Sequence, residues 1–187
     1  MRIISGKLKG KKINFLKSSN TRPLKDSVKE SIFNVIAHSN LLNVVLDEAN
    51  ILDLYSGIGS FGLECISRGS KKITFVEKDF EVVKVLNENL MNLSIHDQAL
   101  IVTDTISNFL ERDQNDKFQI IFLDPPFAEN NYIQDLETIY QKKVYTKNHL
   151  IIIHRDRKNS ENFRDVFKPL ITKEFGRSKI IFGNFLN

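Results

Sequence analysis

Short apolar segments alternate with amphipathic stretches of helical periodicity through most of this chain. Apolar runs rich in Ile, Leu, Val and Phe favour strands, and apolar residues that recur once per helical turn favour helices. Strands are predicted at 51–55, 72–76, 100–103, 119–123 and 149–153, with helices near 60–68, 80–92, 105–111 and 131–142. Strands joined by helices form a mostly parallel sheet with right-handed crossovers and helices on both faces. The pattern therefore predicts an α/β fold.

The two ends of the chain depart from this alternation. Residues 1–15 predict short strands that turn at Gly6 and Gly10, which would form a small N-terminal β-hairpin. At the other end, 170–175 and 179–185 predict an antiparallel C-terminal hairpin at the sheet edge.

A helix is expected between the N-terminal hairpin and the first strand of the sheet. It should begin at Asp26 or Ser27, because Ser27 and Glu30 match a capping box. At 187 residues the chain is long enough for one main domain and too short for two of ordinary size. We therefore predict an N-terminal extension over 1–40 and a main domain over 41–187.

The composition is that of a globular protein, with 41% hydrophobic and 27% charged residues. No apolar run approaches the ~18 residues that a membrane span needs, and the N-terminus does not resemble a secretory signal. These features predict a cytoplasmic protein. A single cysteine, Cys65, and four histidines without metal-ligand spacing predict neither a disulfide nor a metal site. We expect a monomer.

Positive charge is concentrated near the N-terminus. Residues 1–30 contain nine Lys or Arg and two acidic residues, whereas the rest of the chain carries more acidic than basic side chains. Such a segment is typical of contact with a phosphate backbone. Lysines also protect exposed sheet edges from unwanted pairing, and the sequence leaves both interpretations open.

Four residues follow the apolar segment that ends at Leu123: Asp124, Pro125, Pro126 and Phe127. Two prolines cannot continue a central strand, so they leave the sheet as a stiff turn. The Asp124 carboxylate and the Pro125 carbonyl can accept hydrogen bonds from an exocyclic amine, and the Phe127 ring can stack on a base. Because an Asp-Pro turn is also a common way to end a strand, these residues alone do not establish a function.

Three other features fall at the carboxyl ends of predicted strands, where ligands bind in open parallel sheets. The first is the glycine-rich loop 53–62. The second is Glu77, whose carboxylate could accept both hydroxyls of a ribose. The third is the pair Asp104 and Thr105, which could read an adenine edge with a side-chain acceptor and a backbone N–H. Together they predict a nucleoside pocket.

The spacing Gly57-x-Gly59-x-x-Gly62 also matches a dinucleotide fingerprint, so a nicotinamide oxidoreductase is one interpretation. Asp53, followed by Ser56, argues against it. A carboxylate near the N-terminus of a helix opposes a bound pyrophosphate but attracts an ammonium group. S-adenosylmethionine carries an ammonium, an adenosine and a sulfonium methyl, and it therefore fits the loop better.

These motifs together resemble the RsmD-type family of small-subunit rRNA guanine methyltransferases, which have the class I methyltransferase fold. The matching segments cover nearly the whole chain: 1–6, 20–23 with Asp26, Glu30, Phe33 and Asn34, then 52–59, 62–64, 67–69, 76–79 and 122–127. The resemblance implies a Rossmann-like fold and methyl transfer from S-adenosylmethionine to the 2-amino group of one guanine. The implied substrate is 16S rRNA, either free or in an assembling small ribosomal subunit.

The residues and the resemblance together give three sets of candidate site residues. The catalytic set is Asp124, Pro125, Pro126 and Phe127. The cofactor-binding set is Asp53, Tyr55, Ser56, Gly57, Gly59, Glu77, Lys78, Asp104 and Thr105. The RNA-binding set is Arg22, Lys25 and Lys29, with Lys7, Lys9, Lys11 and Lys12 as further contacts. Two positions depart from the family: Phe127 stands where a tyrosine is common, and His154 stands where an acid is frequent.

We expect Asp124 and the Pro125 carbonyl to orient the guanine amine while Phe127 stacks on the base. A strong general base is not needed, because the amine becomes acidic only after methylation. Two other functions stay open. An adenine-amine methyltransferase acting on DNA or RNA would use the same Pro-Pro-aromatic arrangement. A non-catalytic RNA-binding module would explain the basic segment but not the acidic pocket.

Overall fold

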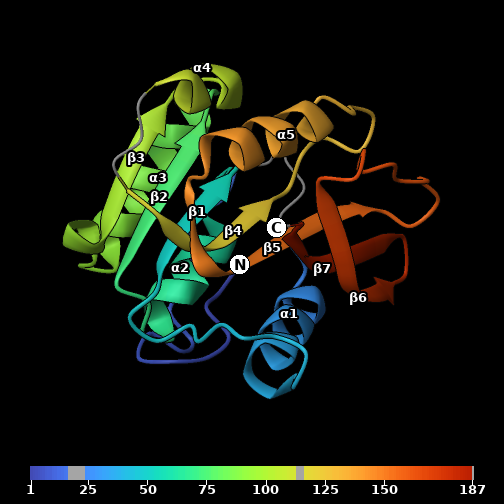
Figure 1. The fold of residues 1–187 in the computed structure, drawn as a ribbon. Helices are drawn as coiled ribbons and strands as arrows, with labels where there is room; N and C mark the ends of the chain where they lie inside the picture. Colours follow the sequence, from blue (N-terminus) through green and yellow to red (C-terminus); the bar gives the residue numbers. More distant parts are fainter. Residues whose placement is uncertain (17–23, 113–115, 187) are drawn as a thin grey trace.

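The computed structural model describes residues 1–16, 24–112 and 116–186, which form a seven-stranded sheet between two layers of helices (Figure 1). The strands are β1 Asn50–Leu54, β2 Lys72–Glu77, β3 Ala99–Thr103, β4 Phe118–Leu123, β5 Tyr145–Asp156, β6 Phe167–Phe175 and β7 Ser178–Phe185. The helices are α1 Asp26–His38, α2 Ser60–Ser67, α3 Phe80–Asn92, α4 Ile106–Glu111 and α5 Tyr132–Lys142, with a short 3₁₀-helix at His96–Gln98.

The strand order is β3-β2-β1-β4-β5-β7-β6. The first five of these strands pair in parallel, and β7 pairs antiparallel with both β5 and β6. This confirms the predicted α/β class with a mostly parallel sheet and an antiparallel C-terminal hairpin.

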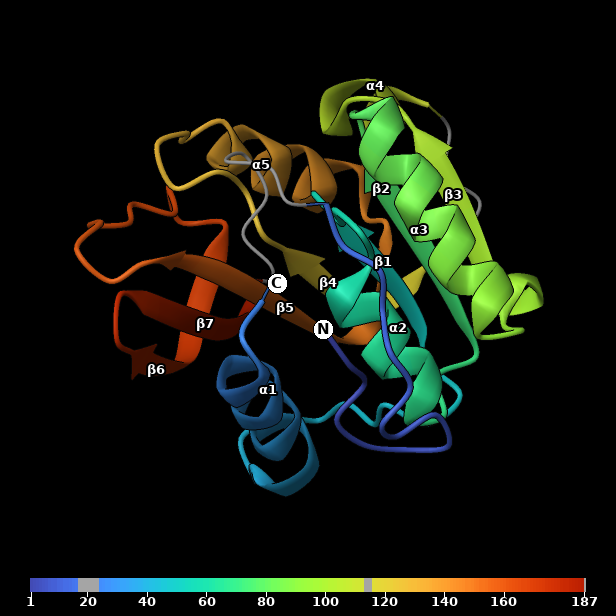
Figure 2. The same ribbon diagram turned by 180° about the vertical axis from the view of Figure 1, so that it is seen from behind.

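Each face of the sheet is covered by its own apolar core. Alternate residues of a strand point to opposite faces, so in β4 Ile120 and Phe122 pack with α1, α2 and α3, while Ile121 and Leu123 pack with α4 and α5. Figure 2 shows α1, α2 and α3 in front of the sheet. The ring of Phe122 stacks on that of Phe61 in α2, with their centroids 4.1 Å apart.

The N-terminal segment differs from the predicted hairpin. It makes antiparallel backbone bonds, such as Ile3 N to Lys11 O at 2.9 Å, but forms only the isolated bridge between Arg2 and Lys12 instead of regular strands. Helix α2 holds the segment in place. Side chains of α2 and its terminal carbonyl accept hydrogen bonds from backbone N–H groups that would otherwise bond to the partner strand of a hairpin.

The carboxylate of Glu64, which is fully buried in α2, accepts hydrogen bonds from the backbone N–H groups of Ile4 and Ser5, each at 2.9 Å. At the end of α2 the carbonyl of Ser67 accepts from Lys7 N at 2.7 Å. Gly6 passes so close that a Cβ there would lie 1.9 Å from the Ser67 carbonyl oxygen. The segment is therefore fixed along α2.

Helix α1 begins at Asp26, within the predicted range, but the predicted capping box is absent. The N-cap is Lys25, whose side chain makes no capping bond, and Ser27 lies inside the first turn. The backbone N–H groups of Val28 and Lys29 instead donate to the Lys25 carbonyl, each at 3.0 Å.

Lys29 corrects the predicted RNA-binding set. Its side chain is fully buried, its ammonium donates to the Arg2 carbonyl at 2.9 Å, and it lies 3.2 Å from the Asp26 carboxylate. Because it has these internal partners, it holds α1 against the N-terminal segment and is not available to a phosphate.

Strand β5 is longer than predicted, since it runs to Asp156 instead of ending near 153. Past the end of β4 it keeps pairing with β7, in the register His154 with Ile180 and Arg155 with Lys179. The extension carries the polar side chains of His154, Arg155 and Asp156 beyond the parallel part of the sheet. Within the described residues, no helix is long and apolar enough to cross a membrane.

Candidate active site

Four neighbouring parallel strands end in register. Leu54 of β1 pairs with Val76 of β2 and with Leu123 of β4, and Leu123 pairs in turn with Ile153 of β5. The residues that follow these positions therefore meet along one edge of the sheet. The structure brings together there the glycine-rich loop, Glu77, residues 124–127 and His154.

The loop between β1 and α2 turns through left-handed backbone conformations. The φ angles of Tyr55, Gly57 and Gly59 are 57°, 54° and 84°. At Gly59 a Cβ would meet a Leu86 side-chain carbon at 2.5 Å, so a side chain fits neither the backbone angle nor the space. The glycines allow the chain to reverse sharply before α2 starts.

Asp53 lies beneath this loop and is fully buried. Its Oδ2 accepts a hydrogen bond from the Gly62 N–H at 3.0 Å, whereas its Oδ1 and the Ser56 hydroxyl have no hydrogen-bond partner in the described structure. Burial raises the pKa of Asp53 well above its usual value, and the nearby Asp124 and Glu77 charges raise it further. Two buried polar atoms without partners fit a ligand that brings a cationic hydrogen-bond donor.

Glu77 connects the loop to the start of α3. One of its carboxylate oxygens accepts from Gly57 N at 3.0 Å and the other from Asp79 N at 2.9 Å. A carboxylate oxygen has two lone pairs, so each can still accept a further bond from a ligand hydroxyl. Lys78, which follows Glu77, is exposed.

Asp104 and Thr105 follow β3 at the same edge, but their hydrogen bonds are internal. The Asp104 carboxylate accepts from Thr105 N at 2.8 Å and from Asn108 Nδ2 at 2.9 Å, and it pairs with Arg112. The bonds from Asn108 and Thr105 hold the pKa of Asp104 below its usual value. Both backbone N–H groups of the pair that could read an adenine are therefore already donated in this structure, that of Thr105 to the Asp104 carboxylate and that of Asp104 to the Glu77 carbonyl.

The catalytic candidates lie between β4 and α5. Oδ1 of Asp124 is 2.8 Å from Nδ1 of His154, and the Phe127 ring meets the His154 ring edge to face at a centroid distance of 5.2 Å. The Asp124 carboxylate is partly exposed, with 24% of its side-chain surface accessible. It can therefore still reach a substrate.

A fully buried arginine that we did not single out from the sequence shapes this loop. Arg155 donates to the carbonyls of Pro126 at 3.0 Å, Phe127 at 3.2 Å and Glu129 at 2.9 Å. Its guanidinium also lies over the Tyr132 ring, 4.4 Å from the centroid. The Pro125 carbonyl accepts none of the Arg155 bonds. Arg155 had no motif to mark it, and its only signal was its position two residues after the predicted apolar strand 149–153.

Other polar side chains contact Arg155 and the loop. Glu161 lies 3.5 Å from Arg155 Nε and 3.4 Å from the Lys179 ammonium, and it accepts a bond from the Tyr132 hydroxyl. Asn159 Nδ2 donates to the Phe127 carbonyl at 3.0 Å. The loop is thus held from several directions by side chains of β5, β7 and the segment between β5 and β6.

Tyr55 links the glycine-rich loop, where the cofactor candidates lie, to the part of the site that contains residues 124–127. Its hydroxyl donates to the Asp135 carboxylate of α5 at 2.5 Å. Burial is the main reason why the pKa of both groups lies above its usual value. The loop after β1 is therefore fastened to the helix that follows residues 124–127.

The predicted RNA-binding lysines do not gather at this edge. α2 begins at the site and runs back along the sheet, so the 6–10 turn bound to its end lies near the amino ends of the strands. Lys7 confirms this position because its ammonium donates to Gln98, directly before β3, at 2.9 Å. Lys9, Lys11 and Lys12 are exposed.

Lys25 lies closer to the site than these lysines. It is exposed and, with Met1, Phe15, Leu24 and Asp26, lines an open hollow of about 250 Å³. The sulfur of Met1 is 3.9 Å from the hydroxyl of Ser60, the first residue of α2. Arg22 lies outside the described residues.

Comparison with known proteins agrees with this geometry. Residues 1–184 match the family model described as conserved hypothetical protein 95. The ribosomal RNA small subunit methyltransferase D of Haemophilus influenzae is 35% identical over 93% of this chain and 83% of its own length. The putative rRNA methyltransferase YlbH of Bacillus subtilis is 33% identical over 84% of this chain and 83% of its own length.

The structural comparison gives the same grouping. A solved structure of the putative methyltransferase yhhF from Escherichia coli superimposes with a TM-score of 0.84 at 25% identity, covering 98% of this chain and 96% of the other. The sheet order and the antiparallel C-terminal strands are those of the class I methyltransferase fold. The chain therefore belongs to the conserved hypothetical protein 95 family, the RsmD-type methyltransferases.

Proposed function

We propose that this protein transfers a methyl group from S-adenosylmethionine to the exocyclic 2-amino group of a guanine in small-subunit rRNA. The observation that carries the proposal is the Asp124–Pro125 turn, which presents two hydrogen-bond acceptors near the buried Asp53 carboxylate, whose Oδ1 has no hydrogen-bond partner in the described structure. The family of the chain and the names of its relatives support rRNA as the substrate.

The loop after β1 fits the proposed cofactor. Asp53 Oδ1 and the Ser56 hydroxyl would bind the ammonium end, and Glu77 would accept the ribose hydroxyls through its remaining lone pairs. When bound, S-adenosylmethionine supplies an electrophilic methyl group on a sulfonium. Asp104 and Thr105 would meet the adenine only if the bond between them is shared or broken.

Residues 124–127 fit a flat base with an exocyclic amine. Because His154 holds Oδ1 of Asp124, the other carboxylate oxygen can accept one amine N–H while the Pro125 carbonyl accepts the second. Phe127 then offers its ring to the base. These contacts place the nitrogen lone pair toward the methyl group, and such positioning can supply a large part of a rate enhancement.

The proton leaves after the new N–C bond forms. A methylated amine nitrogen that still carries both protons is acidic, so one proton passes to the Asp124 carboxylate or to water without a strong base. Asp124 therefore orients the nucleophile first and accepts a proton second.

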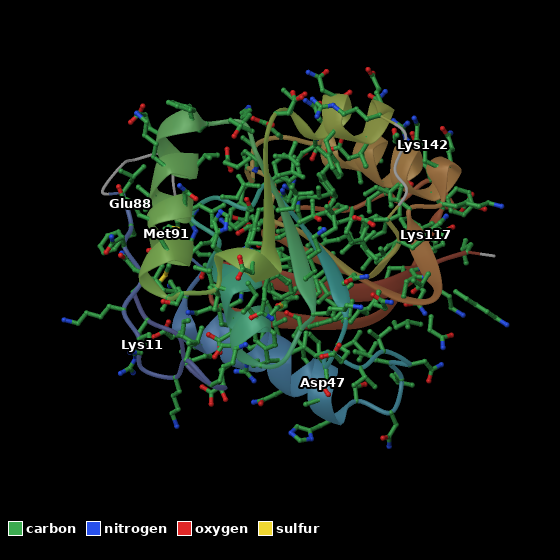
Figure 3. The ribbon with its side chains drawn as sticks, turned by 90° about the vertical axis from the view of Figure 1, so that its left-hand side faces the viewer. Lys11, Asp47, Glu88, Met91, Lys117 and Lys142 are labelled. Atoms are coloured by element: carbon green, nitrogen blue, oxygen red, sulfur yellow. The ribbon has the colours of Figure 1, made fainter. Side chains whose placement is uncertain are left out.

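The basic N-terminal residues suggest how the RNA is held. Lys25 lies on the site side, whereas Lys7 lies at the opposite edge, and Figure 3 shows Lys11 on the same margin as Glu88 and Met91 of α3. An RNA that touches both edges has to be large enough to pass around the protein, which favours a folded rRNA domain or an assembling subunit over a short oligonucleotide. The division into an RNA-facing 1–40 extension and a 41–187 catalytic part stays a prediction.

Product analysis tests the proposal directly. The protein is incubated with methyl-labelled S-adenosylmethionine and, separately, with 16S rRNA, small subunits or DNA, and each product is digested to nucleosides. We expect labelled N2-methylguanosine from rRNA or subunits, and much less of it in the same time with the Asp124→Ala variant. Labelled N6-methyladenosine would support the adenine-amine alternative, and no label in any nucleic acid would support a non-catalytic binding module.

A further inference from the structure

His154 and Asp124 are placed together by the register of the sheet. Leu123 of β4 pairs with Ile153 of β5, so the next residue of each strand lies at the same level. The Asp124 backbone N–H lies 3.4 Å from the Leu54 carbonyl, which keeps residue 124 close to the sheet. β5 continues as a strand at His154 because β7 pairs with it there.

The chemistry of the contact defines which ring nitrogen carries the proton. An ionised carboxylate only accepts hydrogen bonds, so Nδ1, which is 2.8 Å from Asp124 Oδ1, is the donor. Nε2 is buried and has no hydrogen-bond partner among the described residues. A proton on Nε2 instead of Nδ1 would bury an unpaired donor and would leave two lone pairs facing each other, so the Nδ1–H tautomer is favoured.

We propose that His154 is a positioning residue that fixes the rotation of the Asp124 carboxylate, so that one oxygen is taken and the other faces the substrate amine. The inference rests on the proposed function for the identity of the substrate. His154 touches neither substrate nor cofactor in this scheme. It acts on the reaction only through Asp124 and through the edge-to-face contact that its ring makes with Phe127.

Two amide variants separate this role from simple packing. The amide of Asn lies near the position of the imidazole Nδ1, and the longer side chain of Gln carries its amide near the position of Nε2. His154→Asn can therefore keep the donor to Asp124, whereas His154→Gln keeps a polar side chain of similar size but moves the donor away. If packing against Phe127 were the only role, the larger Gln should serve at least as well as Asn.

The kinetic test uses the full-length variants under single-turnover conditions with rRNA or subunits. We expect His154→Asn to retain the methyl-transfer rate within about tenfold, and His154→Gln to lose about a hundredfold, the cost of a misplaced reacting group. Cofactor affinity, measured by titration calorimetry, should stay unchanged in both. Equal rates for the two variants, or a loss confined to cofactor affinity, would contradict the positioning role.

A matched control and a spectroscopic readout make the result independent of folding and of the substrate assignment. His149→Asn removes another buried histidine of β5, which packs on Tyr145 and Phe185, and it should lower the melting temperature without changing cofactor affinity.

The ¹⁵N spectrum of the wild-type imidazoles should show the Nδ1–H tautomer for His154, and this preference should weaken in Asp124→Ala. An Nε2–H tautomer would overturn the inference. If the wild-type protein methylates no guanine, the proposed function fails, while the tautomer still decides whether His154 holds Asp124.

Discussion

The two halves of the site differ in how their polar groups are satisfied. In the cofactor half, Asp53 Oδ1 and the Ser56 hydroxyl are buried without partners. In the half that contains residues 124–127, the loop carbonyls are bound by Arg155 and Asn159. Apart from Nε2 of His154, the buried side-chain atoms without a hydrogen bond among the described residues there are Arg155 Nε and Glu161 Oε1, which face each other as an ion pair at 3.5 Å. Unpaired buried groups cost free energy, whereas a satisfied network makes a segment rigid. The cofactor half therefore lacks hydrogen-bond donors until a ligand supplies them. In the other half, the loop carbonyls already have their donors.

The largest expected effect comes from removing the Arg155 guanidinium, which holds the loop that contains residues 124–127. Arg155→Met should lower the free energy of unfolding by about 3–5 kcal/mol, because it leaves the buried loop carbonyls without their donor and the Glu161 carboxylate without the guanidinium of its ion pair. Urea denaturation measures the loss. The exposed Arg157→Met, which removes only a loose pair with Glu174, should change stability by less than about 1 kcal/mol.

A double variant shows whether the buried charge is the cause. Replacing Glu161 by Gln in the Arg155→Met background should recover part of the lost stability, because the double variant no longer contains a buried carboxylate whose guanidinium partner has been removed. No recovery would mean that the cost comes from the loop carbonyls alone.

The next largest effect falls on turnover. Asp124→Ala should reduce the single-turnover methyl-transfer rate by about 10²–10³-fold, the loss typical of one precisely placed polar group, with little change in cofactor affinity. Rapid-quench kinetics and calorimetry together measure the two quantities. A parallel fall in cofactor affinity would mean that the two halves are not separate in function.

Asp53→Asn should have the opposite effect, lowering cofactor affinity more than the methyl-transfer rate. Cofactor affinity should fall by about tenfold to a hundredfold, since a hydrogen bond to a charged group contributes roughly 1.5–3 kcal/mol, while the ligand-free protein becomes more stable at neutral pH. Calorimetry measures the affinity, and Asp97→Asn, an exposed acid away from the site, is the matched control.

The stability of the Asp53→Asn variant should also depend less on pH. Burial raises the folded-state pKa of Asp53, so the folded protein binds a proton that the unfolded chain has released. The contribution of Asp53 is most favourable below the unfolded pKa of about 4 and is lost as the pH rises through the folded pKa. Wild-type stability should decline over that interval, and a decline of equal size in the variant would contradict the assignment.

The smallest effect concerns the link between the halves. Tyr55→Phe removes the bond to Asp135 and should lower stability by about 1 kcal/mol at neutral pH. Because that bond lowers the pKa of the buried Asp135, its loss should raise this pKa further and make the stability deficit grow as the pH rises. Unfolding at pH 5 and pH 8 checks the trend. A deficit that is constant with pH would mean that Asp135 does not titrate in this interval.

Much of the fold could be predicted because it depends on local patterns. The alternation of apolar and helical segments specified the parallel sheet, and the turn residues at the ends of β1 and β4 marked the edge where the site lies. The N-terminal segment keeps some antiparallel backbone bonds but not regular strands, because other backbone N–H groups donate to the Glu64 carboxylate and the Ser67 carbonyl, which are about sixty residues away in the sequence. The spacing of apolar residues carries no information about such partners.

The sequence by itself determined, to within a residue, where β1, β2 and β4 end, and with them it placed Asp53, Glu77 and Asp124 at one edge of the sheet, because strand period and turn chemistry are local properties. Only the tertiary structure decided that Lys29 is buried, that Lys7 lies at the far edge, and that His154 and Arg155 reach residues 124–127. These placements depend on the packing of the N-terminal segment on α2 and on the pairing of β5 with β7. Both are contacts between distant segments, and charge or apolarity along the chain does not specify which distant segments will meet.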